Sequence, residues 1–166
     1  MNPLAVVTGA SQGLGFAFAQ RLAAEGLRPV LIARSAARLG DAAAQIARES
    51  GIEPLVMSAD VADAAALGRI AADVRASGAP LAWLVCNAGI VRTGTIETMA
   101  AEDIAAQVRT NLLGAMLAAR AFMPLMTAGS RVLFVSSGFG LMGPAGYAAY
   151  SASKAGMIAF AEAVRR

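Results

Sequence analysis

The chain has 166 residues, of which 57% are hydrophobic and 15% are charged, and its formal net charge is +3. This composition predicts a single folded domain over residues 1–166 with a sizeable core, and it excludes a disordered chain. Because the chain contains no histidine and one cysteine, it cannot form Ser-His-Asp or Cys-His catalytic groups, and we expect no metal site.

The charges and the apolar runs also limit the partners of the chain. The arginines are scattered and aromatic residues make up only 5%, so we expect no nucleic-acid partner. No apolar run is long enough to span a bilayer, and residues 1–11 lack the basic region of a signal peptide. With one cysteine, no intrachain disulfide can form. These features predict a cytoplasmic protein without a membrane span.

Short apolar runs alternate with helical segments along the whole chain. The pattern predicts strands at 5–7, 29–33, 54–58, 81–86 and 131–135, and helices at about 16–26, 36–50, 63–76, 101–127 and from 147 onward. Near-continuous apolar strands that alternate with helices are typical of a parallel sheet covered on both faces. The sequence therefore predicts an α/β fold with a doubly wound parallel sheet of the Rossmann type.

The first predicted strand is followed by a glycine-rich turn, Thr8-Gly9-Ala10-Ser11-Gln12-Gly13-Leu14-Gly15. Glycines allow the backbone to approach a pyrophosphate, and the N-terminus of the following helix supplies free N–H groups. The turn is therefore predicted to bind phosphate. The alternative is a tight strand–helix connection that holds no ligand.

Polar or glycine residues follow the carboxyl end of every predicted strand. They are Gly9, Arg34, Asp60, Asn87 and Ser137, in chain order. Ligands of open α/β sheets bind along this edge, so these residues predict one binding site at the carboxyl ends of the strands.

The stretch from Ser137 to Lys154 carries groups that can polarise a carbonyl. Lys154 is the only lysine of the chain, and Tyr150 lies four residues before it. On a helix these two side chains share a face, and Ser137 follows a predicted buried strand. A hydroxyl, a phenol and an ammonium brought together can deliver a proton to a carbonyl oxygen. The alternative is a chance cation–π or packing pair of Tyr150 and Lys154.

Together these motifs resemble the short-chain dehydrogenase/reductase family, in its short soluble branch. The turn Thr8-Gly9-x-x-x-Gly13-x-Gly15 is similar to the cofactor motif of that family. The other motifs of the family are matched in order and spacing by Asp60, Asn87-Ala88-Gly89, Asn111, Ser137 and Tyr150-x-x-x-Lys154.

The resemblance implies an NADP(H)-dependent oxidoreductase that transfers a hydride between nicotinamide and a small-molecule carbonyl or secondary alcohol. Tyr150 would be the general acid/base, Ser137 would bind the substrate oxygen, and Lys154 would bind the nicotinamide ribose. Asn111 would hold a helix distortion and a water that relays protons to Lys154. The implied cofactor-binding residues are Gly9, Ser11, Gln12, Gly13, Leu14, Gly15, Arg34, Ser35, Asp60, Val61, Asn87, Ala88, Gly89, Tyr150 and Lys154.

The end of the second predicted strand favours NADP(H) over NAD(H). An NAD-specific site usually carries a carboxylate here, whereas this chain has Ala33-Arg34-Ser35. Arg34 offers donors suited to a phosphate, and Ser11 and Ser35 add hydroxyl groups. The alternative is that Arg34 is a solvated surface charge. Gln12 stands where many NADP-preferring members of the family carry a basic residue.

Several of these residues also have a purely structural interpretation. Asp60 could cap the next helix, and Asn111 could pack inside its helix. Tyr147 is expected to line the substrate pocket, with surface packing as the alternative. Ser136 and Cys86 are expected to be structural.

The chain ends inside the helix that carries Tyr150 and Lys154, whereas members of this family continue through further strands and a substrate-covering loop. We therefore expect a fold truncated after the fifth strand and the following helix. The apolar helices at 101–127 and from 150 onward pair between subunits in this family, which implies a homodimer or homotetramer. Alternative functions are a non-catalytic nucleotide-binding module and an inactive truncated protein of this family.

Overall fold

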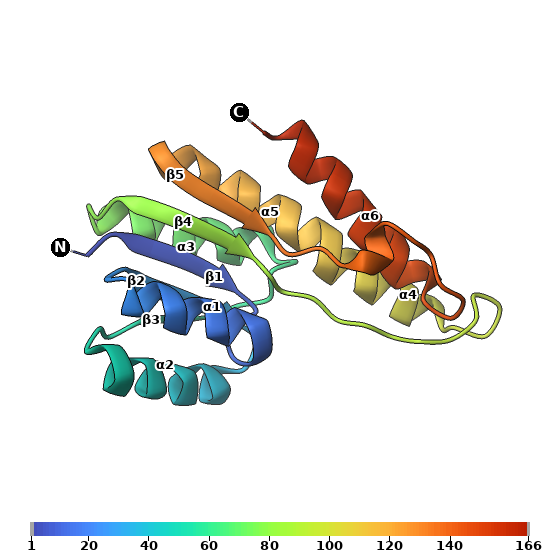
Figure 1. Cartoon of the computed structure of the whole chain (residues 1–166), viewed down its shortest axis with the longest axis horizontal. Coiled ribbons are helices and arrows are strands. Elements are labelled where there is room, and N and C mark those ends of the chain that lie inside the picture. Colours follow the sequence, from blue (N-terminus) through green and yellow to red (C-terminus); the bar gives the residue numbers. More distant parts are fainter. Residues whose placement is uncertain (1, 166) are drawn as a thin grey trace.

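Five parallel strands form the centre of the fold in the computed structural model, which describes residues 2–165 (Figure 1). The strand order is β3-β2-β1-β4-β5, so the chain reverses its direction of winding between β1 and β4. The strands are β1 Leu4–Thr8, β2 Arg28–Ala33, β3 Leu55–Ser58, β4 Leu81–Cys86 and β5 Met126–Phe134. The predicted α/β fold with a doubly wound parallel sheet is confirmed.

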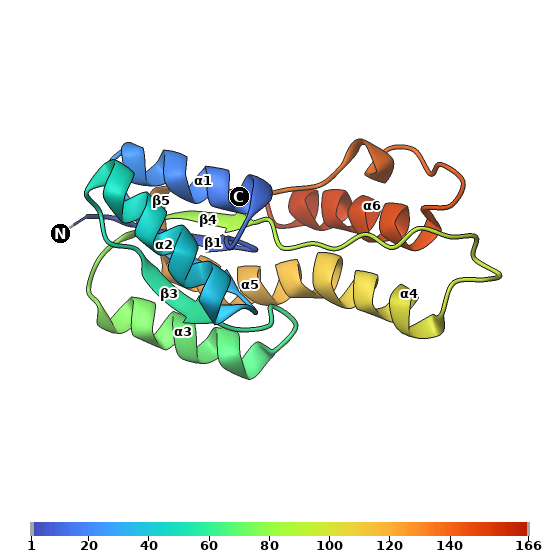
Figure 2. The same ribbon diagram turned by 90° about the horizontal axis from the view of Figure 1, so that it is seen from below.

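Helices cover both faces of this sheet (Figure 2). One face packs against α1 Gly13–Ala24 and α2 Ala36–Ser50, and the other against α3 Ala64–Ala76 and α5 Gly114–Phe122. Successive residues of a strand point to opposite faces. On β1, Val6 therefore joins the core with α3 and α5, whereas its neighbour Val7 joins the core with α1 and α2.

The prediction of one continuous helix at 101–127 is wrong in two ways: the helix has a π-helical interruption, and it ends earlier than predicted. The helix runs as α4 Ala101–Val108, then as a π-helical segment Arg109–Leu113, and then as α5. A short 3-10 turn over Met123–Leu125 follows, with Pro124 in its first turn, and β5 already begins at Met126. Proline cannot donate a backbone hydrogen bond inside a helix, which explains why the helix stops before the predicted boundary.

β5 begins at Met126, five residues before the predicted start at residue 131. The sequence pattern did not indicate this first part because its pairing is irregular. Leu81 of β4 pairs with Met126, but Trp83 pairs with Arg131, so extra residues of β5 bulge out between these pairs. Gly129 has a φ of 89°, and Ser130 Oγ donates to the carbonyl oxygen of Leu81 at 2.8 Å. A bulge of this kind needs a residue that tolerates positive φ.

Two helices and two loops extend beyond the carboxyl ends of the strands, at the right of Figure 1. The helices are α4 and α6 Ala148–Ala163, and the loops follow β4 and β5. The rings of Phe134 on β5 and Phe160 on α6 meet edge to face at 5.5 Å. Among residues 2–165, no helix has both the length and the apolar character that a membrane crossing requires.

Candidate functional site

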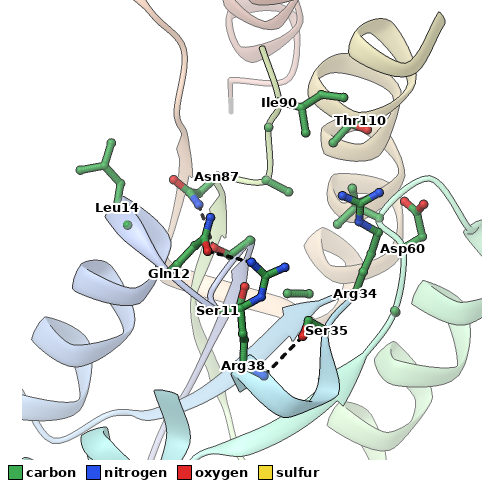
Figure 3. A pocket seen from close by; sticks show the side chains of 17 residues that line it. Ser11, Gln12, Leu14, Arg34, Ser35, Arg38, Asp60, Asn87, Ile90 and Thr110 are labelled. Carbon is green, nitrogen blue, oxygen red and sulfur yellow. Dashed lines mark hydrogen bonds between the residues drawn. The ribbon is translucent and has the colours of Figure 1, made fainter. Parts of the chain in front are cut away.

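A cavity of about 360 Å³ opens at the carboxyl ends of the central strands, where the winding reverses (Figure 3). Its walls come from the turn after β1, the ends of β2, β3 and β4, and the π-helical segment. The residues that line it are Gly9, Ser11, Gln12, Gly13, Leu14, Ala33, Arg34, Ser35, Arg38, Ala59, Asp60, Val61, Asn87, Ala88, Gly89, Ile90 and Thr110. Most of the predicted cofactor-binding residues are therefore brought together.

Hydrogen bonds connect the glycine-rich turn to the residues that follow β4. Thr8 Oγ1 accepts from the backbone N–H groups of Asn87 and Ala88, at 3.0 and 3.1 Å. Asn87 Nδ2 in return donates to the carbonyl oxygens of Thr8 and Gly9, at 3.1 and 3.4 Å. Gly15 packs directly on this junction, because a methyl group added there would lie 2.5 Å from Asn87 Nδ2. Gly15 thus shapes the turn from behind and does not itself line the cavity.

The N-terminus of α1 points free N–H groups at the cavity. Gln12 occupies the N-cap position, but its side chain does not cap the helix, and the first turn contains no acidic residue. The first N–H groups of a helix have no intrahelical partner, and the helix dipole adds positive potential there. These donors fit the phosphate groups of a dinucleotide.

Two arginines add positive charge to the cavity wall. Arg34 follows β2, and Arg38 lies in the first turn of α2, where its Nη1 donates to Oε1 of Gln12 at 3.1 Å (Figure 3). Ser35 Oγ caps α2 by accepting from the N–H of Arg38. The sequence analysis missed Arg38. Its position three residues after the N-cap serine indicates only that it lies in the first turn of its helix, and its place beside Gln12 depends on how α2 packs against the turn after β1.

Asp60 closes the far end of the cavity and does not cap α3. Its Oδ1 accepts from the N–H of Ala62 at 2.9 Å in a tight turn, whereas Asp63 Oδ1 caps α3 by accepting from Ala66 at 3.0 Å. The structural alternative for Asp60 is therefore wrong, since the cap is three residues further along. Ile90 and Thr110 also line the cavity and were also missed (Figure 3).

Lys154 lies just behind the cavity wall. Its side chain is buried, and its Nζ donates to the carbonyl oxygen of Val135 at 2.8 Å. A methyl group added at Gly89, which lines the cavity, would lie 3.5 Å from this Nζ and 3.4 Å from Oδ1 of Asn111. Burial lowers the pKa of Lys154, because the ammonium loses hydration. The ring centroid of Tyr150 is 5.9 Å from the same nitrogen.

Ser137 and Tyr150 are connected through Phe139. Ser137 Oγ accepts from the backbone N–H of Phe139 at 3.2 Å and caps the short helix Gly138–Gly140. The ring of Phe139 lies edge to face with Tyr150 at 6.4 Å and with Tyr147 at 4.8 Å. The oxygen of Ser137 acts as acceptor in this contact, and a hydroxyl that accepts a hydrogen bond can still donate its own O–H. Ser136 Oγ donates to the carbonyl oxygen of Lys154 at 2.9 Å, and so ties the Ser137 segment to α6.

Asn111 is fully buried in the π-helical segment. Its Oδ1 accepts from Ile90 N at 2.8 Å, and its Nδ2 donates to Ile90 O at 2.9 Å and to Ser153 Oγ at 3.0 Å. Ser153 Oγ donates onward to the carbonyl oxygen of Tyr150 at 2.7 Å. The predicted helix distortion at Asn111 is present, and the residue ties the loop after β4 to α6.

Comparison with known proteins agrees with this arrangement. A sequence model of the short chain dehydrogenase family matches residues 3–166. A 3-oxoacyl-[acyl-carrier-protein] reductase of Homo sapiens is 34% identical over 168 residues, covering 100% of this chain and 69% of the relative.

Two solved structures show the same fold. An alcohol dehydrogenase of Thermococcus sibiricus, complexed with 5-hydroxy-NADP, has a TM-score of 0.92 at 27% identity and covers 98% of this chain and 70% of its own. An NAD+-bound xylitol dehydrogenase has a TM-score of 0.89 at 31% identity, and the match covers 97% of this chain and 64% of the xylitol dehydrogenase chain. With the family's sequence pattern matched from residue 3 to residue 166, this chain belongs to the short-chain dehydrogenase/reductase family and is an oxidoreductase of that family.

Proposed function

We propose that the chain transfers a hydride between NADP(H) and a small carbonyl compound or secondary alcohol, with Tyr150 as the general acid/base. The observation that carries this proposal is the position of Lys154. This lysine, the only one of the chain, is buried. Its Nζ lies 5.9 Å from the centroid of the Tyr150 ring and next to Gly89 of the cavity wall. Burying a charged ammonium costs free energy, and every other basic side chain of this chain is an arginine. A single buried lysine therefore favours a catalytic role.

Each proposed catalytic side chain can donate a hydrogen bond to the substrate or the cofactor. In reduction, Tyr150 would give its phenolic proton to the carbonyl oxygen while Ser137 Oγ donates a hydrogen bond to the same oxygen. Lys154 uses one of its three N–H groups on Val135, which leaves two for the phenol and the nicotinamide ribose. The bound cofactor would supply the hydride.

Proton supply to Lys154 is proposed to pass through a water at Asn111. The side chain of Asn111 is committed to Ile90 and Ser153. The relay therefore depends on the widened backbone of the π-helical segment, a feature that often occurs at functional sites.

A preference for NADP(H) over NAD(H) is supported by the charge around the cavity. Arg34 and Arg38 both line it, and residues 33–35 include no carboxylate that would repel a 2′-phosphate. Arg38 supplies the second basic contact that Gln12 does not provide, and Gln12 Oε1 holds its guanidinium in place. Hydrogen bonds from arginine to phosphate are charge-assisted and frequently bidentate.

The test compares the two cofactors in two arginine variants. Arg34→Ala and Arg38→Ala should each raise KM for NADPH by roughly 10- to 150-fold, the loss expected for one charged hydrogen bond, and leave KM for NADH nearly unchanged. Arg48→Ala on exposed α2 surface is the matched control. If wild type uses NADH as efficiently as NADPH, or if both variants affect the two cofactors equally, the preference is wrong.

Two broader predictions remain part of the proposal. A cytoplasmic location is supported by the single cysteine, whose buried thiol has its pKa raised to about 12 by loss of hydration. A homodimer or homotetramer is supported by exposed apolar side chains along the long helix, Val108 and Leu113.

A further inference from the structure

Two side-chain amides on one helix hold the backbone of the loop that follows β4. Gln107 lies in the last turn of α4, four residues before Asn111, and residues four apart share a helix face. Asn111 binds both the N–H and the carbonyl oxygen of Ile90, and Gln107 Oε1 accepts from the N–H of Arg92 at 2.9 Å. The two amides therefore bind alternate residues of an extended segment, as an edge strand would. We call Gln107 and Asn111 the amide clamp.

Gln107 is as deeply buried as Asn111, at 0% exposure. Its Nε2 donates to the carbonyl oxygen of Asp103 at 3.2 Å and to Met99 Sδ at 3.6 Å. Burying an amide costs free energy unless its groups are paired. An apolar side chain of the same size would fill the space without that cost, so the amide's contribution is its hydrogen bonding to the loop.

The loop has few other attachments. Val91, Arg92 and Thr93 are exposed. Before Ile90, the loop is held by the hydrogen bonds of Asn87 and Ala88 with Thr8. Beyond Ile90, residues 91–94 have two other ties to distant parts of residues 2–165: a hydrogen bond from Gly94 N to Gly146 O at 3.0 Å and a surface ion pair between Arg92 and Asp103 at 3.5 Å. Surface ion pairs contribute little to stability, and exposed loops with few apolar contacts open readily. The hydrogen bond from Arg92 to Gln107 is therefore the main fixed point beyond Ile90.

We propose that Gln107 is a positioning residue for the cofactor, because its carboxamide fixes Arg92 and thereby holds Ile90 and Gly89 in place as a wall of the cavity. The inference rests on the proposed nucleotide-binding function. It assigns to Gln107 an effect on cofactor affinity that is separate from its effect on folding stability.

The test uses two substitutions that separate these effects. Gln107→Met keeps the size of the side chain and removes the acceptor for Arg92, whereas Gln107→Glu keeps an acceptor oxygen but buries a carboxyl group, which lowers stability. NADPH affinity, measured by fluorescence titration, should follow the order wild type, Glu, Met. The Met variant should bind roughly 2- to 12-fold more weakly, the range for one neutral hydrogen bond. Thermal unfolding should place Glu at or below Met.

The control is Gln45→Met on α2, where a half-buried glutamine donates to Glu49 at 2.9 Å. It should leave NADPH affinity unchanged. The inference is overturned if Gln107→Met binds NADPH as tightly as wild type, or if affinity follows thermal stability across the three Gln107 proteins.

A measurement on the wild-type protein keeps the inference testable if a variant does not fold. The N–H of Arg92 should exchange with solvent at least tenfold more slowly than those of Val91 and Thr93, which have no acceptor among residues 2–165. Equal exchange rates at the three amides would overturn the clamp. Failure of the wild type to bind NADPH would instead refute the proposed function, and the exchange rates would still test the clamp.

Discussion

A methyl group added at Gly15 should both distort the glycine-rich turn after β1 and lower the stability of the fold. In Gly15→Ala the new carbon would collide with the carbonyl oxygen of Gly9, and would lie 2.5 Å from Asn87 Nδ2 and 2.8 Å from the carbonyl carbon of Gly9. Ordinary contact begins near 3.4 Å, so α1 and the turn must separate by about 1 Å. Overpacking of this kind costs about 1–3 kcal/mol, and straining the Asn87 hydrogen bonds adds about 0.5–1.5 kcal/mol. We expect a total loss of about 1.5–4.5 kcal/mol.

The assay is urea unfolding combined with NADPH titration. The matched control is Gly68→Ala inside α3, where an added methyl group meets no atom within 4 Å. That variant should be about 0.5–1 kcal/mol more stable, since alanine replaces glycine in a helix, and should bind NADPH normally. If Gly15→Ala unfolds within 0.5 kcal/mol of wild type and binds NADPH as tightly, the packing argument for the turn is refuted.

Two further predictions concern Tyr150 and Lys154, the proposed catalytic pair. If the phenol supplies the proton as proposed, Tyr150→Phe should lower kcat by at least about 100-fold and leave NADPH affinity within about twofold of wild type. A variant that keeps more than a tenth of kcat contradicts the assignment. Burial lowers the pKa of Lys154 in the folded protein below the 10.5 of the unfolded chain. Between the lowered pKa and this unfolded value, the unfolded chain binds more protons than the folded one, so the free energy of unfolding rises with pH. Urea unfolding from pH 7 to 10 should therefore show wild type gaining stability relative to Lys154→Met, and a constant difference between the two proteins would disprove a depressed pKa.

The strands and their polar ends could be predicted because each depends on a local signal. A short apolar run followed by Gly9, Arg34, Asp60, Asn87 or Ser137 marks both a strand and its carboxyl end, and all five residues follow strands as expected. The edge of the sheet where they gather follows from parallel pairing alone.

The missed features depend on contacts between distant segments. The early start of β5 rests on the hydrogen bond between Ser130 and Leu81, which are 49 residues apart. Arg38 reaches the cavity only because α2 packs beside the turn that contains Gln12. Gln107 is polar in a helix of mixed composition, and its burial becomes apparent only when the loop at Arg92 lies across it.

The π-helical segment Arg109–Leu113 joins α4 and α5 into one helix, and both halves are fixed to other parts of the fold, so residues cannot easily be inserted or deleted between them. The half before it is fixed to the loop through Gln107, and the half after it packs into the sheet through Ala118 and Phe122. Each residue turns an α-helix by about 100°, so deleting or inserting one residue here would rotate one half relative to the other by that angle. Insertions and deletions should therefore be tolerated in the exposed loop at 95–98, where they rotate no buried face, and rejected between residues 109 and 113.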